Sequence, residues 1–200
     1  IWVAKQKKYD TNIKSGKYRI NDKLNNNDLV NLLRSGNQVP VRVTFNNIRT
    51  IEDFASVISN QLEIDSNLIV QSILDSSFLE SHNFSKYNVA TLFIPNTYEF
   101  YWNISVENFI SRLIKEYSAF WNKNRIRKAK EIGLTKKEVT ILASIVEKEQ
   151  NIKTDERKII AGLYLNRIKK NMKLESDPTL VFALGDFSIK RVLNKDKKIK

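Results

Sequence analysis

The clearest alternation of apolar and polar positions in the chain lies in residues 135–150. At about 100° per residue, its apolar side chains gather on one side of a helix: Val139, Ile141, Leu142, Ala143, Ile145 and Val146. Thr135 followed three residues later by Glu138 is a capping box, so we expect the helix to begin here. Glu149 falls about 20° from Leu142. The pattern therefore predicts an amphipathic helix that carries a carboxylate on its apolar side.

The two acids near the end of this predicted helix differ in kind. A carboxylate that faces a core loses hydration, which favours its neutral form. Glu149 could therefore keep a proton near neutral pH and donate it as a general acid. The alternative is that Glu149 lies at a frayed helix end, reaches water or pairs with Arg157, and does no chemistry. Glu147 falls on the polar side and is expected to be a solvated surface acid.

The first half of the chain has the patterns of short strands and helices. The expected elements are a helix end at 2–9, a strand at 17–20, a helix ending at Gly36, strands at 41–45 and 90–94, and, between those two strands, helices that begin at Thr50 and Ser66. The order strand, helix, helix, strand resembles the LysM module, a small domain known for binding polymers that contain N-acetylglucosamine. A packing domain without a ligand would have the same order.

From Asn96 onward the chain becomes rich in aromatic residues and long helical patterns. We expect Ser105 to cap a helix and most of the nearby rings to be core, whereas Tyr98 could stack on a sugar. A later helix is expected to begin with a cap at Thr154 or Asp155. Its inward positions would be Ile159, Ile160, Leu163, Tyr164 and Ile168. Asp177 followed by Pro178 is expected to cap a last helix, which ends at Gly185.

Composition limits the class of protein. The chain has 200 residues and 42% hydrophobic content, which suffices for a real core, and it contains no run of 18 apolar residues. It lacks cysteine, and its single histidine, His82, lies in a polar stretch; disulfides, zinc fingers and a Ser-His-Asp triad are therefore not expected. We expect no metal and no cofactor. The net charge of +12 comes without a basic stripe interleaved with aromatics, so nucleic-acid binding is not expected.

Four segments then resemble the YceG-like family of endolytic murein transglycosylases. They are LFIPNTYEFYW (92–102), LASIVEKE (142–149), IIAGLYLNRI (159–168) and MKLESDPTLVFALGD (172–186). The resemblance covers nearly the whole chain, in order and spacing. It implies an α+β fold in three parts: the end of a truncated N-terminal α/β unit (1–39), a LysM-like βααβ subdomain (40–97), and a mainly α-helical catalytic domain (98–200) that is truncated at its C-terminus.

The resemblance also implies an activity and its residues. The family's catalytic Glu falls on Glu149, which would protonate the linkage between N-acetylmuramic acid and N-acetylglucosamine and leave a 1,6-anhydro end without consuming water. The residues that line or brace the family's cleft fall on Asn166, Arg167, Asp177, Pro178 and Thr179, and Tyr98 and Glu175 are further candidates for substrate binding. The family often has Thr where Gln150 stands and Gln where Glu175 stands. The second departure adds an acid near the site.

Two other functions stay open at this stage. In a hydrolytic muramidase, Glu175 or Asp177 would be the second carboxylate. A peptidoglycan-binding module without chemistry would bind glycan strands and cleave none. In every case the implied partner is the glycan strand of peptidoglycan, with cell-wall synthases as possible companions. The resemblance implies a protein of the cytoplasmic membrane, attached by one N-terminal helix that this chain lacks, with the catalytic domain on the periplasmic or extracellular side.

Overall fold

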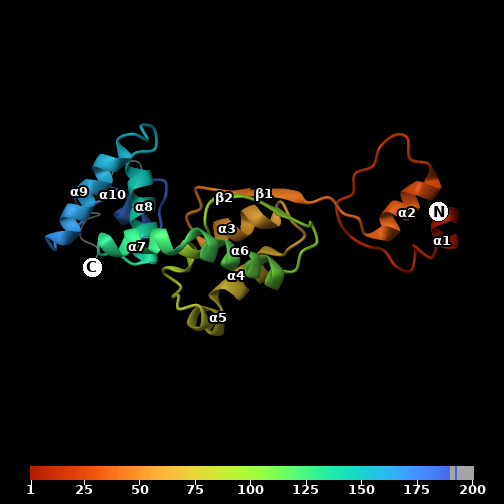
Figure 1. Cartoon of the computed structure of the whole chain (residues 1–200), viewed down its shortest axis with the longest axis horizontal. Coiled ribbons are helices and arrows are strands. Elements are labelled where there is room, and N and C mark those ends of the chain that lie inside the picture. The colour runs from red at the N-terminus through yellow and green to blue at the C-terminus, as the bar shows by residue number, and fades with distance from the viewer. Residues whose placement is uncertain (190–191, 193–200) are drawn as a thin grey trace. The chain divides into compact units, whose positions relative to one another are not determined.

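The computed structural model describes residues 1–189 and 192. The fold is α+β, as expected, and the chain forms two compact units, Ile1–Phe120 and Trp121–Lys200 (Figure 1). The predicted division into three parts, with boundaries after residues 39 and 97, stays a prediction. Within residues 1–189 and 192, no helix has both the length and the apolar character that a membrane crossing requires.

The first unit begins with two short helices. Helix α1 spans Trp2–Gln6 and α2 spans Asn26–Ser35. The side chain of Asn25 caps α2, and the predicted stop at Gly36 is confirmed by its left-handed φ of 72°. The predicted strand at 17–20 is wrong, because these residues form no ladder. The Val39 amide donates to the Lys17 carbonyl at 2.8 Å, and the Tyr18 hydroxyl donates to the Lys14 carbonyl at 3.0 Å.

The first unit contains a two-stranded antiparallel sheet. Strand β1, Val41–Phe45, pairs with β2, Asn96–Phe100. The first strand was predicted, but the strand expected at 90–94 is wrong. That segment forms a 3-10 turn, η1 (Val89–Leu92), and the chain becomes a strand only after Pro95. Short apolar runs suit a buried turn as well as a strand, so the pattern could not separate the two.

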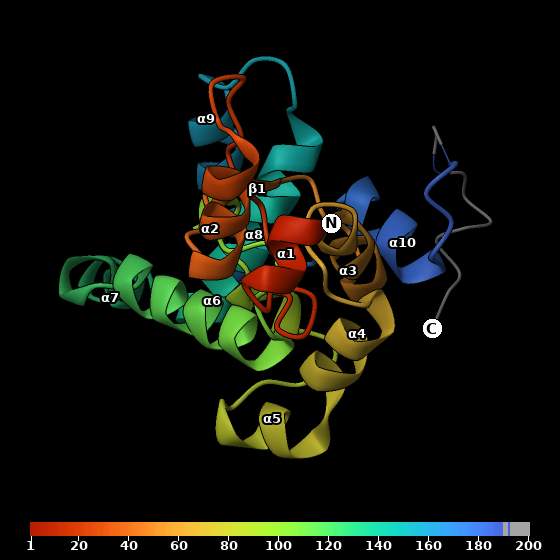
Figure 2. The same ribbon diagram turned by 90° about the vertical axis from the view of Figure 1, so that its right-hand side faces the viewer.

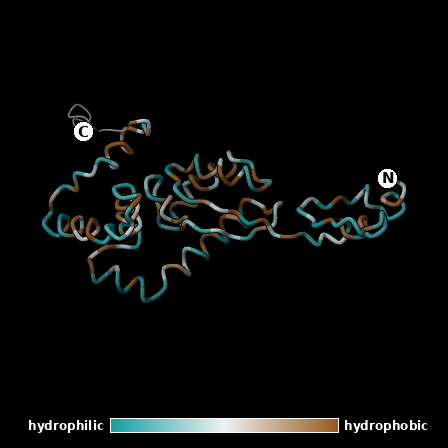
Figure 3. Tube along the Cα trace, turned by 90° about the horizontal axis from the view of Figure 1, so that it is seen from above, coloured by the Kyte–Doolittle hydropathy of each residue, from teal (hydrophilic) through white to brown (hydrophobic). Residues whose placement is uncertain are grey.

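Four helices complete the first unit. They are α3 (Ile51–Ser59), α4 (Ser66–Leu74), α5 (Ser76–Ser81) and α6 (Val106–Phe120). The hydropathy of the chain alternates along the helices as expected for amphipathic elements (Figure 3). Phe45, Phe54 and Phe109 are fully buried, and the Phe54 ring stacks on Phe93 at 4.3 Å between centroids. The sequence did not predict α5, which the Asp75 side chain caps.

The second unit is helical. It contains α7 (Lys123–Glu131), α8 (Lys136–Glu149), α9 (Arg157–Lys169) and α10 (Asp177–Leu184). The predicted capping box of α8 is confirmed: the Glu138 amide donates to Thr135, and the Glu138 carboxylate accepts from the Thr135 amide. Helix α8 lies beside α9 (Figures 1 and 2). The buried core between these helices consists of Leu134, Leu142, Ile145, Val146 and Tyr164.

Two predictions about α9 are wrong. Neither Thr154 nor Asp155 caps it, since the helix begins at Arg157 with Glu156 at the N-cap. Of the five positions expected to face inward, three are exposed: Ile159 by 75%, Leu163 by 56% and Ile168 by 37%. Apolar residues occur on all sides of α9, so its sequence does not define a single buried face.

Candidate active site around Glu149

Two hydroxyl groups converge on one oxygen of the Glu149 carboxylate. The Tyr164 phenol donates to Oε1 at 2.7 Å, and the Ser176 hydroxyl donates to the same atom at 2.6 Å. Tyr164 comes from the middle of α9, and Ser176 comes immediately before α10. Three segments that are separate in the sequence therefore meet at the C-terminal end of α8.

Both donors are held by buried parts of the second unit. The exposed fraction is 5% for Tyr164 and 1% for Ser176. Burial is the main cause that raises the pKa of the Tyr164 phenol; Glu149 adds to the rise, while Ser176 and Arg167 oppose it. The phenol therefore keeps its proton at neutral pH and remains a hydrogen-bond donor to the carboxylate.

The position of Glu149 corrects the expectation of a core-facing acid. Glu149 is exposed, although its carboxylate accepts hydrogen bonds from two buried side chains. It is the last residue of α8, and Gln150 already leaves the helix with ψ of 87°. The helical phase correctly predicted that Glu149 points toward neighbouring helices, because it contacts Tyr164 and Ser176. It did not predict that Glu149 is exposed, because α8 ends at this residue.

Arg157 pairs with Glu147 rather than with Glu149. The distance between Arg157 Nη1 and Glu147 Oε1 is 4.0 Å, and the Glu147 side chain is 47% exposed. The same arginine donates through Nε to the Gln150 carbonyl at 2.8 Å. Arg157 therefore ties down the turn that follows α8, and the alternative pairing of Arg157 with Glu149 is not observed.

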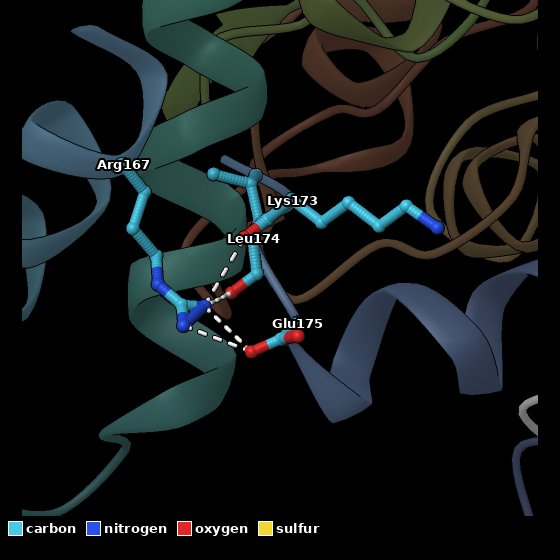
Figure 4. A network of polar contacts seen from close by, with 4 residues as sticks. All are labelled: Arg167, Lys173, Leu174 and Glu175. Atoms are coloured by element: carbon cyan, nitrogen blue, oxygen red, sulfur yellow. Dashed lines mark hydrogen bonds and ion pairs between the residues drawn. The ribbon is translucent and has the colours of Figure 1, made fainter. Parts of the chain in front are cut away.

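Arg167 holds the segment that leads to Ser176 (Figure 4). Its Nη1 donates to the carbonyls of Lys173 and Leu174 at 3.1 and 2.9 Å, and both Nη atoms donate to Glu175 Oε2 at 3.0 and 2.8 Å. Glu175 has a φ of 55°, a conformation that is uncommon for a residue with a side chain. Arg167 thus fixes an unusual backbone turn from which Ser176 projects toward Glu149.

The other predicted cleft residues have different positions. Thr179 donates through Oγ1 to the Ser176 carbonyl at 2.6 Å and so holds Ser176 from the α10 side. Asp177 is exposed and is the first residue of α10, which corrects its prediction as the cap, because Ser176 occupies the N-cap position. Asn166 is exposed on α9. Among the described residues, no hydrogen bond joins Asn166 or Asp177 to Glu149.

Tyr98 belongs to the core of the first unit. Its ring is 6% exposed and stacks on Phe45 at 5.5 Å, and its hydroxyl donates to the Ile94 carbonyl at 2.6 Å. Burial raises the pKa of Tyr98 to about 12. This position does not favour the predicted stacking on a sugar, which needs an open ring face, so Tyr98 is not part of the proposed site.

The site contains two residues that the sequence did not single out. Tyr164 was predicted only as a core residue, and Ser176 was not predicted at all. The signal for Ser176 is its place directly before Asp177-Pro178, since a serine one residue before a helix start is a preferred N-cap. Within residues 1–189 and 192, no group of three or more His, Cys, Asp or Glu side chains could hold a metal ion.

The arrangement suits proton transfer by a single carboxyl group. A carboxylate oriented by two fixed donors keeps one oxygen occupied and leaves Oε2 for a substrate. A carboxylate in the last turn of a helix also lies where the helix has partial negative charge, a position that does not stabilise the fold. Residues that break a local rule of stability in this way often serve chemistry.

The model of the YceG-like family matches residues 1–200. The chain is 26% identical over 214 residues to the endolytic murein transglycosylase of Streptococcus pneumoniae, with 92% of this chain and 38% of that protein covered. It is 25% identical over 203 residues to the endolytic murein transglycosylase of Bacillus subtilis, with 92% and 55% covered. The chain therefore spans about two-fifths to a little over half of the length of these relatives.

A crystal structure of a yceG-like protein from Listeria monocytogenes has a similar fold. The TM-score is 0.69 at 23% sequence identity, and the match covers 100% of this chain and 70% of that chain. At this identity the likeness establishes the fold alone.

Proposed function

The chain belongs to the YceG-like family, and we propose on this premise that its protein is a lytic transglycosylase that cleaves peptidoglycan strands internally. The observation that carries the proposal is the carboxylate of Glu149, whose Oε1 accepts hydrogen bonds from Tyr164 and Ser176. All three residues lie in segments that resemble the family. The names of the curated relatives give the same reaction class.

In the proposed reaction Glu149 acts first as an acid and then as a base. The protonated carboxyl gives its proton to the oxygen between N-acetylmuramic acid and N-acetylglucosamine, and the bond from that oxygen to C1 breaks. The resulting carboxylate takes the proton from the C6 hydroxyl of the muramic acid. The C6 oxygen then bonds to C1 and forms the 1,6-anhydro ring. No water is consumed. The first proton stays on the released N-acetylglucosamine oxygen, and the proton of the C6 hydroxyl restores the neutral form of Glu149.

The alternative is a muramidase, which needs a second carboxylate to activate water or to attack the sugar. Glu175 has a structural contact, because its Oε2 accepts two hydrogen bonds from Arg167, the residue that holds the turn before Ser176. Asp177 is exposed on the same segment as Ser176, so it is the residue on which hydrolysis would depend.

We extend the proposal to the protein's surroundings. The substrate is the glycan strand, and the site of action is outside the cytoplasmic membrane, to which an N-terminal helix beyond this sequence attaches the protein. The part predicted as βααβ, residues 40–97, is proposed to be LysM-like. The support is that β1 is followed by α3 and α4 and pairs with β2. The structure adds α5 and η1 between α4 and β2, and β2 extends to Phe100. We also propose that the protein works beside cell-wall synthases, and the support for this is the family resemblance alone.

The experiment is an analysis of product ends. Purified glycan strands are incubated with the full-length protein and with its Asp177→Asn variant, and the products are separated and identified by mass spectrometry. We expect 1,6-anhydro ends from both proteins. Reducing ends from the wild type that disappear in Asp177→Asn would establish the muramidase instead, and binding without cleavage would establish the inert module.

A further inference from the structure

We propose that Tyr164 and Ser176 are positioning residues that assign different tasks to the two oxygens of Glu149, with Oε1 held by the protein and Oε2 presented to the glycosidic oxygen. The inference rests on the proposed function and deepens it. Neither residue is expected to touch the glycan. Both would act through Glu149.

The first step of the argument is that both donors reach the same atom. Tyr164 Oη and Ser176 Oγ lie 2.7 and 2.6 Å from Oε1. The Glu149 carboxylate accepts these two hydrogen bonds from the described residues 1–189 and 192, and Oε2 accepts none from them. A carbonyl-type oxygen has two lone pairs, so the two hydroxyls fill Oε1 when the proton is on Oε2.

The second step is that the same two bonds serve both protonation states. When Glu149 is neutral, Oε1 is the carbonyl oxygen and accepts from both hydroxyls. When Glu149 has lost its proton, Oε1 still accepts from both, and the bonds become shorter and stronger because the acceptor is charged. The carboxyl group therefore need not rotate between the acid step and the base step, and Oε2, which gave its proton to the glycosidic oxygen, accepts another from the C6 hydroxyl.

The third step is that Ser176 is diverted from its ordinary structural role. It occupies the N-cap of α10, where a serine hydroxyl normally accepts a hydrogen bond from a backbone amide of the first turn. Among the described residues it makes no such bond, and α10 begins without a side-chain cap. A cap contributes about 1 kcal/mol to stability. The helix forgoes this contribution, and the hydroxyl points to Glu149 instead.

The fourth step is that the backbone around Ser176 is fixed from both sides. Before it, Arg167 binds the carbonyls of Lys173 and Leu174. After it, the Thr179 hydroxyl binds the Ser176 carbonyl. Tyr164 is fixed differently, because its ring packs in the core of the second unit. Because the backbone and the core hold Ser176 and Tyr164 in place, their hydroxyls can orient the carboxylate of Glu149 even though this residue is exposed.

The test compares Tyr164→Phe and Ser176→Ala with the wild type in the full-length protein. Each variant removes one hydroxyl and keeps the ring or the small side chain. We expect each to lower kcat by about 10- to 100-fold, the usual effect of losing a hydrogen bond to a charged group, and to leave KM within about twofold. The double variant should lose less than the product of the two single losses, because both hydroxyls act on one atom.

Two matched variants control for the loss of a hydroxyl elsewhere. Tyr117→Phe removes a phenol hydroxyl from a side chain that is 7% exposed in the first unit, and Ser144→Ala removes a hydroxyl that bonds the Ile141 carbonyl on α8. Both should keep the wild-type kcat. Circular dichroism checks that every variant is folded. Ser176→Thr, which restores the hydroxyl, should recover part of the kcat that Ser176→Ala loses.

The outcomes separate this inference from the proposed function. Wild-type kcat in Tyr164→Phe, or a loss that appears only in KM, would overturn the positioning role while anhydro ends from the wild type still supported the transglycosylase. Reducing ends from the wild type, combined with a low kcat in both variants, would overturn the transglycosylase and keep the positioning of an acid. Absence of cleavage by the wild type would overturn both.

Discussion

Glu149 gains its properties from its neighbours rather than from its place in the helix. The C-terminal end of α8 disfavours negative charge, and the residue is exposed. Two buried hydroxyls nevertheless orient its carboxylate. Glu147 on α8 and Glu175 before α10 have different partners: Glu147 forms an ion pair with Arg157 at 4.0 Å, and Glu175 forms one with Arg167 at 2.8 Å. At the scale of single residues, the site therefore consists of one carboxylate and the two hydroxyl groups that orient it.

Replacing Glu149 by Gln should lower the rate of glycan cleavage by about two to four powers of ten, because an amide cannot give and take the proton. The amide can still accept from Tyr164 and Ser176 through its carbonyl oxygen, so the fold should remain. The rate is measured by following the appearance of product ends from isolated strands. Glu147→Gln is the matched control and should retain the wild-type rate. Equal losses in the two variants would remove the special role of Glu149.

Arg167 should matter more for the backbone that it binds than for its ion pair. Arg167→Met breaks the bonds to the Lys173 and Leu174 carbonyls and should lower the free energy of unfolding by about 1–2 kcal/mol, together with kcat. Glu175→Gln breaks only an ion pair whose acid is 70% exposed, so stability should change by less than about 0.5 kcal/mol. Urea unfolding of both variants measures the difference. A larger loss in Glu175→Gln would contradict this assignment.

Helical phase placed Glu149 on the apolar side of its helix, and the family resemblance made it the candidate acid, but neither identified its partners. Tyr164 lies 15 positions from Glu149 and Ser176 lies 27 positions away. Pairs so distant meet only through tertiary packing, which periodicity does not describe. For Tyr98 the sequence left core packing and sugar stacking open, because an aromatic residue can have the same sequence pattern in both settings. The structure places its ring in the core of the first unit.

At the scale of the elements, helix ends determine the geometry of the site. The capping box fixes where α8 begins, and the turn after α8 is tied by Arg157 to the Gln150 carbonyl. The start of α10 presents Ser176. The sequence predicted the start of α8 because capping boxes are local. It did not predict the start of α9, which has no side-chain cap, or the turn η1, whose apolar residues have no distinctive period.

The capping box should make the second unit sensitive to acid. The bond from the Thr135 amide, followed by that from the Thr135 hydroxyl, holds the pKa of Glu138 below its ordinary value of 4.5. A lowered pKa in the folded state contributes stability that is present above about pH 4.5 and is lost as the pH falls through the folded value. Glu138→Gln should therefore reduce stability at pH 7 and flatten its decline below about pH 4.5.

Urea unfolding of Glu138→Gln and the wild type at several pH values measures this effect. Thr135→Ala should lower stability by about 1 kcal/mol at neutral pH, the usual value of a lost N-cap. The Glu147→Gln variant serves as a control for the loss of an acid from the same helix. An unchanged acid dependence in Glu138→Gln would show that the capping carboxylate does not control it.

Two glycines of the second unit should respond in opposite ways to alanine. Gly162 lies within α9, and a Cβ built there would meet no described atom within 4 Å. Gly162→Ala should therefore raise the free energy of unfolding by about 0.5–1 kcal/mol. Gly133 has the same open surroundings but a φ of 78°, so Gly133→Ala should be destabilising. Thermal unfolding of both variants checks the sign, and destabilisation by Gly162→Ala would contradict the open helical environment.

At the scale of the whole molecule, the chain has two compact units of different construction. The first is built around an antiparallel pair of strands and a cluster of phenylalanines, and the second is helical and contains the Glu149 site. The sequence predicted the α+β class and the family because several separate blocks agreed at once. The net charge of +12 has no assigned role in the site, although a basic protein is suited to an anionic cell wall.

The most direct measurement of the central claim is glycan cleavage by the full-length protein in water labelled with heavy oxygen, followed by mass spectrometry of the new ends. If the Glu149 carboxylate removes the proton of the C6 hydroxyl and the C6 oxygen bonds to C1, the muramic acid ends carry a 1,6-anhydro ring and no label. Muramic acid ends that carry labelled oxygen at C1 would mean that water attacks the sugar, and the account of a single carboxylate acting on an internal nucleophile would be wrong.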